Sequence, residues 1–182
     1  LRASGEPIGE RGAGTYAGCL RITVDGAPLS DVFAGARTAS LSPAGGQFGL
    51  FTPCIYGGQE PTSEAFLFGL RADAENRSNV AVANVGPSDA GLVSLEVRTF
   101  DGDLGGTEVG SAATVTLAPG QWYQYVNFLK VRGIESGWVK VTRTGGTAPW
   151  IAYGVINDGG SPGERTGDGA YVPPFVRGPG GN

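Results

Sequence analysis

The chain has 182 residues, of which 33 are glycine and 12 are proline, and its formal net charge is −4. Because 40% of the residues are hydrophobic and only 16% are charged, the composition favours a folded chain over a disordered one. There is no histidine and there are only two cysteines, which excludes imidazole catalysis and zinc or iron sites built from clusters of these residues. We therefore expect no cofactor and no metal centre of these kinds.

The basic residues are few and scattered. Eleven arginines and two lysines occur singly, and the sequence pI is about 4.8, so we expect no nucleic-acid partner. No apolar stretch approaches the roughly 20 residues of a membrane helix, so we expect no membrane insertion either. Residues 1–5 lack the apolar core of a signal peptide, which predicts a mature or a cytosolic chain.

Alternation of apolar and polar residues predicts strands along most of the chain. In the segment 93–100, valine or leucine at positions 93, 95 and 97 alternates with polar residues at 94, 96 and 98. Glycine, proline, asparagine and aspartate mark the turns between segments of this kind. The predicted strands cover residues 16–24, 32–41, 47–52, 65–71, 78–85, 93–100, 109–117, 121–127, 138–144, 150–157 and 170–173. Residues 128–132 suit a single helical turn.

Many short strands, without a helix that could cross over a parallel sheet, predict an all-β fold. We expect an antiparallel immunoglobulin-like β-sandwich over residues 61–176, preceded by a partial β repeat over residues 15–60. Residues 1–14 would then form an extended N-terminal segment, and residues 177–182 a C-terminal tail. The residues that we expect in the core are Val80, Val82, Val93, Leu95, Val97, Val115, Leu117, Val139, Val141, Ile151 and Val155.

The partial repeat is inferred from an internal similarity. The segments 137–142, 151–155 and 169–173 resemble the segments 18–23, 31–35 and 46–50 in their pattern of glycine, aromatic and β-branched residues. Either a duplication or a hairpin pattern common to many strands would account for it. In the case of duplication, residues 15–55 correspond to the last three strands of a sandwich and leave strand edges without partners.

The two cysteines, Cys19 and Cys54, are predicted to form a disulfide, although two unrelated buried thiols are the alternative. In the chain-entropy model, a bond that closes a loop of this length stabilises the fold by about 3–4 kcal/mol. A disulfide requires an oxidising compartment. We therefore expect an extracellular or cell-surface protein that has lost its signal peptide.

Several short motifs together resemble a known family. They lie at residues 64–71, 77–84, 117–122, 137–141, 153–158 and 168–173, and the last of them reads Asp-Gly-Ala-Tyr-Val-Pro. In type and order these motifs resemble a largely uncharacterised tandem-repeat β-sandwich domain of large secreted bacterial surface proteins. The resemblance covers about residues 32–174 and implies an extracellular spacer, adhesion or surface module. It carries no catalytic residues to this chain.

The carboxylate residues are the main candidates for metal binding or catalysis. Asp101, Asp103 and Glu108 could hold calcium, but they lack the regular ligand spacing of a calcium loop, so a polar hairpin is the favoured interpretation. Four further carboxylates could supply a glycosidase pair, but nothing in the sequence fixes their separation; they are Glu60, Glu64, Asp73 and Glu75. Serine nucleophiles have no histidine to activate them. We therefore do not expect an enzyme.

Three aromatic residues form a candidate contact site. On one short strand, Trp122 would point to one face, and Tyr123 and Tyr125 to the other. One face could belong to the core while the other packs under a loop. The alternatives are a platform for sugar rings and a protein interface, where tyrosine and tryptophan are enriched.

Taken together, the residues predict a secreted bacterial structural or adhesion protein, such as a subunit of an extracellular filament. It would form a homo-oligomer or polymer through strand edges or terminal segments. The predicted assembly segment is N-terminal and contains Leu1, Arg2, Ile8 and Arg11. The alternative is a carbohydrate-binding module that binds surface glycans through an aromatic platform near Trp122.

Overall fold

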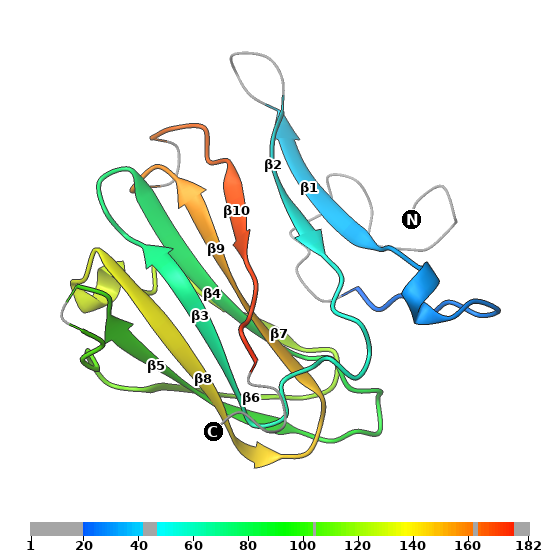
Figure 1. Cartoon of the computed structure of the whole chain (residues 1–182). Helices are drawn as coiled ribbons and strands as arrows, with labels where there is room; N and C mark the ends of the chain where they lie inside the picture. Colours follow the sequence, from blue (N-terminus) through cyan, green and yellow to red (C-terminus); the bar gives the residue numbers. More distant parts are fainter. Residues whose placement is uncertain (1–19, 42–46, 104, 162–163, 177–182) are drawn as a thin grey trace.

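A computed structural model of the protein describes residues 20–41, 47–103, 105–161 and 164–176. In this part of the chain it contains ten strands and two short 3₁₀ helices (Figure 1). The elements are η2 (Leu29–Asp31), β1 (Gly35–Leu41), β2 (Gln47–Pro53), β3 (Glu64–Arg71), β4 (Asn76–Asn84), β5 (Val93–Asp101), β6 (Ala113–Leu117), β7 (Trp122–Tyr125), η3 (Lys130–Arg132), β8 (Ser136–Gly146), β9 (Trp150–Asp158) and β10 (Gly169–Val172). The helical turn predicted at 128–132 is confirmed by η3.

The eight strands from β3 to β10 form two four-stranded sheets. Their strand orders are β10-β9-β4-β7 and β3-β8-β5-β6, and all neighbouring strands are antiparallel. The two sheets pack face to face, which confirms the predicted all-β antiparallel sandwich (Figure 1). The immunoglobulin-like connectivity of the strands stays a prediction. Among the described residues, no helix is long and apolar enough to span a bilayer.

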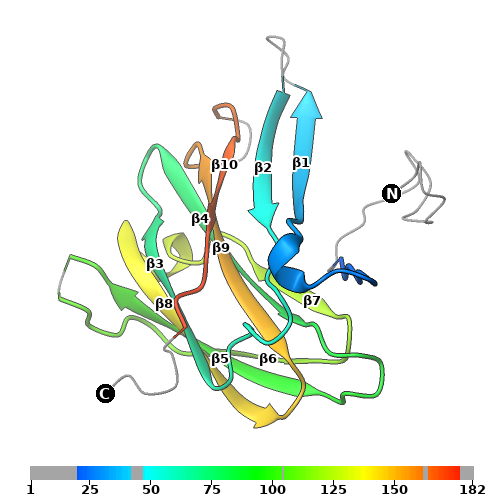
Figure 2. The ribbon, with the colours of Figure 1, turned by 45° about the vertical axis from the view of Figure 1, so that its right-hand side comes forward.

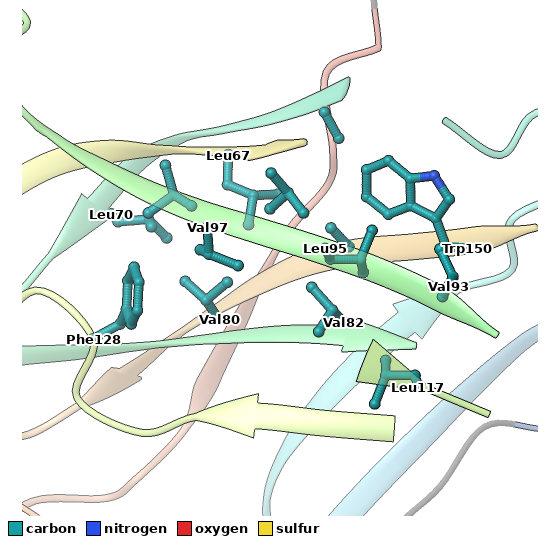
Figure 3. Close-up of a cluster of buried hydrophobic side chains, with 14 of the residues drawn as sticks. Leu67, Leu70, Val80, Val82, Val93, Leu95, Val97, Leu117, Phe128 and Trp150 are labelled. Atoms are coloured by element: carbon teal, nitrogen blue, oxygen red, sulfur yellow. The ribbon is translucent and has the colours of Figure 1, made fainter. Parts of the chain in front are cut away.

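The core lies between these two sheets (Figure 3). In β5, every second residue from Val93 to Thr99 is buried, because successive side chains of a strand point to opposite faces. Residues of β3, β4, β6, β8 and β9, of the segment before η3 and of the loop between β8 and β9 complete the same cluster. Its buried members are Ala65, Leu67, Leu70, Val80, Val82, Val93, Leu95, Val97, Leu117, Phe128, Leu129, Val139, Val141, Ala148, Trp150 and Ala152.

Most of the residues predicted in the core are buried there, with three differences. Ile151 is only half-buried, and Trp150 takes the core position beside it with 0% of its surface exposed. Two adjacent apolar residues fit either phase of a period-two pattern, so the prediction of Ile151 was wrong by one residue. Val115 is half-buried at the margin of the core, and Val155 is buried on the outer face of its sheet.

The chain before Glu64 forms one hairpin in its described part rather than three strands. Strands β1 and β2 pair with each other in a separate sheet, from Gly35 opposite Pro53 to Leu41 opposite Gln47. The strand predicted at 16–24 is wrong for residues 20–24, which have no regular structure. The predicted segments 1–14 and 177–182 lie outside the described residues.

The hairpin stands beside β10, in both views of the molecule (Figures 1 and 2). The Gly49 N–H donates a hydrogen bond to Asp168 Oδ1, with an N–O distance of 2.8 Å. A side chain at Gly169 would place its Cβ only 3.3 Å from two carbon atoms of Leu50, so glycine lets β2 approach this closely. The hairpin is thereby fixed over one edge of the first sheet.

Candidate functional site

The outer face of the sheet β10-β9-β4-β7 has large residues on its flanking strands and small ones on the central strand. Ala81 of β4 lies opposite both Gln124 of β7 and Tyr153 of β9, and Ala83 lies opposite both Trp122 and Ile151. The two alanines are 1% and 0% exposed, respectively. The larger neighbours therefore cover the two alanines.

The hairpin converts part of this face into a groove of about 510 Å³. Strands β1 and β2 form one wall, the outer face of the sheet forms the floor, and the residues before β10 close one side. The lining residues are Thr38, Ala39, Phe48, Gly49, Leu50, Asn79, Gln124, Tyr153, Val155, Asn157, Thr166, Gly167 and Gly169. Pockets of this size hold small molecules or a few units of a polymer.

Three amide side chains from three neighbouring strands line the groove: Asn79, Gln124 and Asn157. Asn79 Oδ1 accepts a hydrogen bond from the Asn127 N–H at 3.0 Å, which fixes the orientation of this amide. The Asn79 NH₂ group and the amides of Gln124 and Asn157 have no hydrogen-bond partner among the described residues. Each free amide can donate and accept hydrogen bonds to a ligand.

Aromatic residues continue along the same face. The indole N–H of Trp122 donates to the hydroxyl of Tyr153 at 3.0 Å, and the ring of Tyr153 lies 5.7 Å from that of Tyr171, centroid to centroid. Burial raises the pKa of Tyr171 to about 12, and the nearby hydroxyl of Tyr153 acts in the same direction. Tyr171 is therefore uncharged at neutral pH.

The residues between β9 and β10 are held by a charged network next to the groove. Thr166 donates to Asp158 Oδ2 through its hydroxyl at 2.6 Å and through its N–H at 3.2 Å. The hydroxyl bond is the main reason why the pKa of Asp158 lies below its usual value. Arg165 pairs with Glu75 at 2.8 Å. These charges bind one another, and the lining contains no charged side chain among the described residues.

The three aromatic residues predicted as a contact site lie on two faces, as the alternation indicated. Trp122 is on the outer face, whereas Tyr125 packs against the core and lies 5.1 Å from Phe128, centroid to centroid. Tyr123 is on the side of Tyr125 and remains 46% exposed. The aromatic partner of Trp122 is instead Tyr153, which in turn packs against Tyr171. Sequence analysis missed both tyrosines because no local pattern shows which strands become neighbours.

The carboxylates considered for chemistry are engaged elsewhere. Arg98 binds Glu108 at 2.8 Å and Glu96 at 2.6 Å, and Glu108 therefore belongs to an ion-pair cluster. Asp101 Oδ1 accepts a hydrogen bond from the Asp103 N–H. Asp103 Oδ1 accepts a hydrogen bond from the Ser136 hydroxyl. No group of three potential metal ligands is present in the described ranges.

The remaining predicted site residues lie mostly outside the described ranges. Cys54 is half-buried and forms no disulfide with a described residue, and its predicted partner Cys19 lies outside them. The assembly residues Leu1, Arg2, Ile8 and Arg11 also lie outside them. The disulfide and the N-terminal assembly segment stay predictions.

In comparisons with known proteins, no family model, no curated protein and no solved structure matches this chain. The resemblance to a tandem-repeat domain of secreted proteins therefore also stays a prediction. Function has to be inferred from the groove and its surroundings.

Proposed function

We propose that this chain is a non-catalytic adhesion module that binds a neutral glycan in the groove between the β1–β2 hairpin and the outer face of the sheet. The observation that carries the proposal is a set of three amides in a groove whose described lining has no charge: Gln124 and Asn157 are uncommitted, and Asn79 keeps a free NH₂ group. Asn79, Gln124 and Asn157 come from adjacent strands, so their positions are fixed by sheet pairing rather than by a loop.

Sugar hydroxyls both donate and accept hydrogen bonds, and so do amide side chains. The ring of Tyr153 adds an apolar surface inside the groove, on which the C–H face of a sugar ring can pack. Trp122 lies beside it and holds its hydroxyl in place. The described lining has no charged side chain, which favours a neutral glycan over a phosphorylated, sulfated or acidic one, because no described lining residue compensates the charge of such a ligand.

A binding role rather than catalysis is supported by the state of the carboxylates. Glu64 binds Lys140 at 2.6 Å, Glu75 binds Arg165 at 2.8 Å, and Glu108 binds Arg98 at 2.8 Å. None of these three residues lines the groove. The chain also has no histidine that could act as a general base.

A location outside the cell is the part of the proposal that rests on Cys19 and Cys54. A disulfide between them would fit an oxidising compartment. Titration of the oxidised protein in denaturant should then find no free thiol. Two reactive thiols would remove this support while leaving the groove argument unchanged.

The glycan proposal is tested by native affinity electrophoresis in gels that contain one neutral polysaccharide each: β-1,4-glucan, xylan, mannan or galactan. We expect at least one of them to retard the protein. The double variant Gln124→Ala/Asn157→Ala should lose most of this retardation, because it removes two of the three amides from the groove. Gln59→Ala is the matched control, since Gln59 is an exposed amide outside the groove.

Retardation by none of the neutral polysaccharides would contradict the proposal. So would equal retardation of the wild type and the double variant, because the binding surface would then lie elsewhere. Stronger retardation by polygalacturonate than by any neutral polysaccharide would contradict the assignment of a neutral ligand. The circular dichroism of each variant shows whether the sandwich is intact.

Self-association is a second candidate function, and a different surface favours it. It was predicted from strand edges and from terminal segments that lie outside the described residues, and within the described part a different segment pairs with a strand edge. Residues 173–176 leave one sheet and contact β3 of the other.

A further inference from the structure

The outer face of the second sheet carries a cluster of five aromatic residues, which we call the aromatic surface. Its members are Phe66 and Phe68 of β3, Phe100 of β5, Trp138 of β8 and Phe175. Phe100 and Trp138 stack with a centroid distance of 3.9 Å, and Phe68 lies 5.7 Å from Trp138. Phe68 is 50% exposed and Phe175 is 55% exposed. Exposed aromatic clusters of this kind mark interaction sites more often than ordinary surface.

Phe175 reaches this surface from the opposite sheet. After β10 ends at Val172, the chain crosses through Pro173 and Pro174 to the free edge of β3 (Figures 1 and 2). There Phe175 exchanges two backbone hydrogen bonds with Phe66: the Phe66 N–H donates at 2.9 Å and the Phe175 N–H donates at 2.8 Å. Its ring lies 6.1 Å from that of Phe68. Residues 173–176 thus cover part of an edge strand.

The contact between this segment and its own β3 is small. Phe175 is the single residue of the segment that pairs with β3 in the described part of the chain. Pro173 and Pro174 have no backbone N–H, so the segment before Phe175 cannot donate further backbone hydrogen bonds to β3. They also favour an extended, stiff backbone, which keeps the segment ready to bind a strand edge.

We infer that the β3 edge and the aromatic surface bind the segment 173–176 of a second copy of this chain. The segment fits this place because it already makes the contact within one chain, and the same bonds can re-form between chains. Exchange re-forms the contact between the half-exposed rings of Phe68 and Phe175, with Phe175 of each copy against Phe68 of the other. A strand edge that is only partly covered is a common site for such pairing.

The charges around the aromatic surface allow two copies to approach. Lys140 binds Glu64 at 2.6 Å and lies 5.6 Å from the ring centroid of Phe66. On the neighbouring strand β5, Arg98 binds Glu96 of the same strand and Glu108, which follows β5 in the chain. Positive and negative groups alternate there, so two identical surfaces can meet without placing a block of like charge against itself.

Light scattering after size-exclusion chromatography tests the inference with the full chain, from micromolar to millimolar concentrations. We expect the mass of the wild type to rise with concentration to two copies or more. Reciprocal exchange would end at a closed dimer, and one-way transfer of the segment would give longer chains. Phe175→Pro removes the N–H that donates to Phe66 and should weaken association by about tenfold or more. Phe33→Ala is the control, because Phe33 is 78% exposed and outside the aromatic surface.

A cross-link shows whether the segment itself is exchanged. Photoreactive benzoylphenylalanine replaces Phe175. Equal amounts of isotopically labelled and unlabelled protein, both with this replacement, are unfolded and refolded together. Mixed-isotope cross-links between the peptide that contains residue 175 and the peptide that contains Phe66 are the expected result. A wild type that stays monomeric at every concentration would overturn the inference. So would a Phe175→Pro variant that associates as well as the wild type, or cross-links confined to single chains. The groove lies on the other sheet, so these results do not depend on glycan binding.

Discussion

Trp122 on β7 donates its indole N–H to the hydroxyl of Tyr153 on β9, at a distance of 3.0 Å. Strand β4 separates β7 from β9 in the sheet. The two side chains can meet because the intervening residues, Ala81 and Ala83, have only methyl groups on this face. The bond therefore spans the central strand beside the groove, which Tyr153 also lines. It links Trp122, whose direction alternation predicted, with Tyr153, which sequence analysis did not connect with it.

The first prediction concerns this bond. Tyr153→Phe should lower the free energy of unfolding by about 1 kcal/mol, because it removes the acceptor of a half-buried N–H group. Chemical denaturation followed by tryptophan fluorescence measures the change. Tyr171→Phe is the matched control, since its hydroxyl has no hydrogen-bond partner among the described residues. Equal effects of the two variants would show that the Trp122–Tyr153 bond contributes nothing of its own.

The second prediction concerns the phase of β9. Trp150→Ala should destabilise the fold by about 3–5 kcal/mol, because it removes a fully buried large side chain and leaves a cavity. Ile151→Ala should cost less than Trp150→Ala, since Ile151 is half-buried on the outer face. Thermal and urea unfolding of both variants checks the order. A larger loss for Ile151→Ala would mean that β9 faces the core with its other side.

The third prediction concerns a central pair of the core. Val97 of β5 lies opposite Val141 of β8, and both are fully buried. Val97→Asp should unfold the domain, because burying an unpaired charge costs on the order of 10 kcal/mol, which is comparable with a native stability of about 5–15 kcal/mol. Thr144→Asp, at an exposed position of β8, should remain folded. A cooperative wild-type thermal transition for Val97→Asp would contradict the assigned core.

The fourth prediction concerns pH. Hydrogen bonds from Thr166 hold the pKa of Asp158 below its usual value of 3.8 in the folded protein. The charged carboxylate therefore stabilises the folded state above about pH 4, and this stabilisation is lost as the pH falls through the folded pKa. Asp158→Asn should lower the melting temperature at pH 7, and its difference from the wild type should shrink towards pH 3.

Asp89→Asn provides the comparison for this experiment. Asp89 is an exposed carboxylate on another loop, and its side chain has no hydrogen-bond partner among the described residues. Its variant should differ little from the wild type at either pH. A difference between Asp158→Asn and the wild type that stays constant from pH 7 to pH 3 would show that the charge of Asp158 does not stabilise the fold.

Local patterns in the sequence were sufficient to predict most of the strands and many side-chain directions, although the strand predicted at residues 20–24 is absent. Alternation between positions 93 and 99 predicted which side of β5 is buried, because the two faces of a strand repeat every two residues. The same rule placed Trp122 opposite Tyr123 and Tyr125. It was ambiguous at Trp150 and Ile151, where two adjacent apolar residues satisfy either phase.

The neighbours of each strand were decided only by the tertiary structure. Trp122 and Tyr153 are 31 residues apart, and Phe175 pairs with Phe66 across two different sheets. A period-two pattern contains no information about which strand lies beside which, since that choice depends on how all the strands bury one shared core. The groove and the aromatic surface are built from such long-range neighbours. The sequence alone therefore determined most of the β-strands and many of their faces, whereas packing of the whole chain determined both candidate sites.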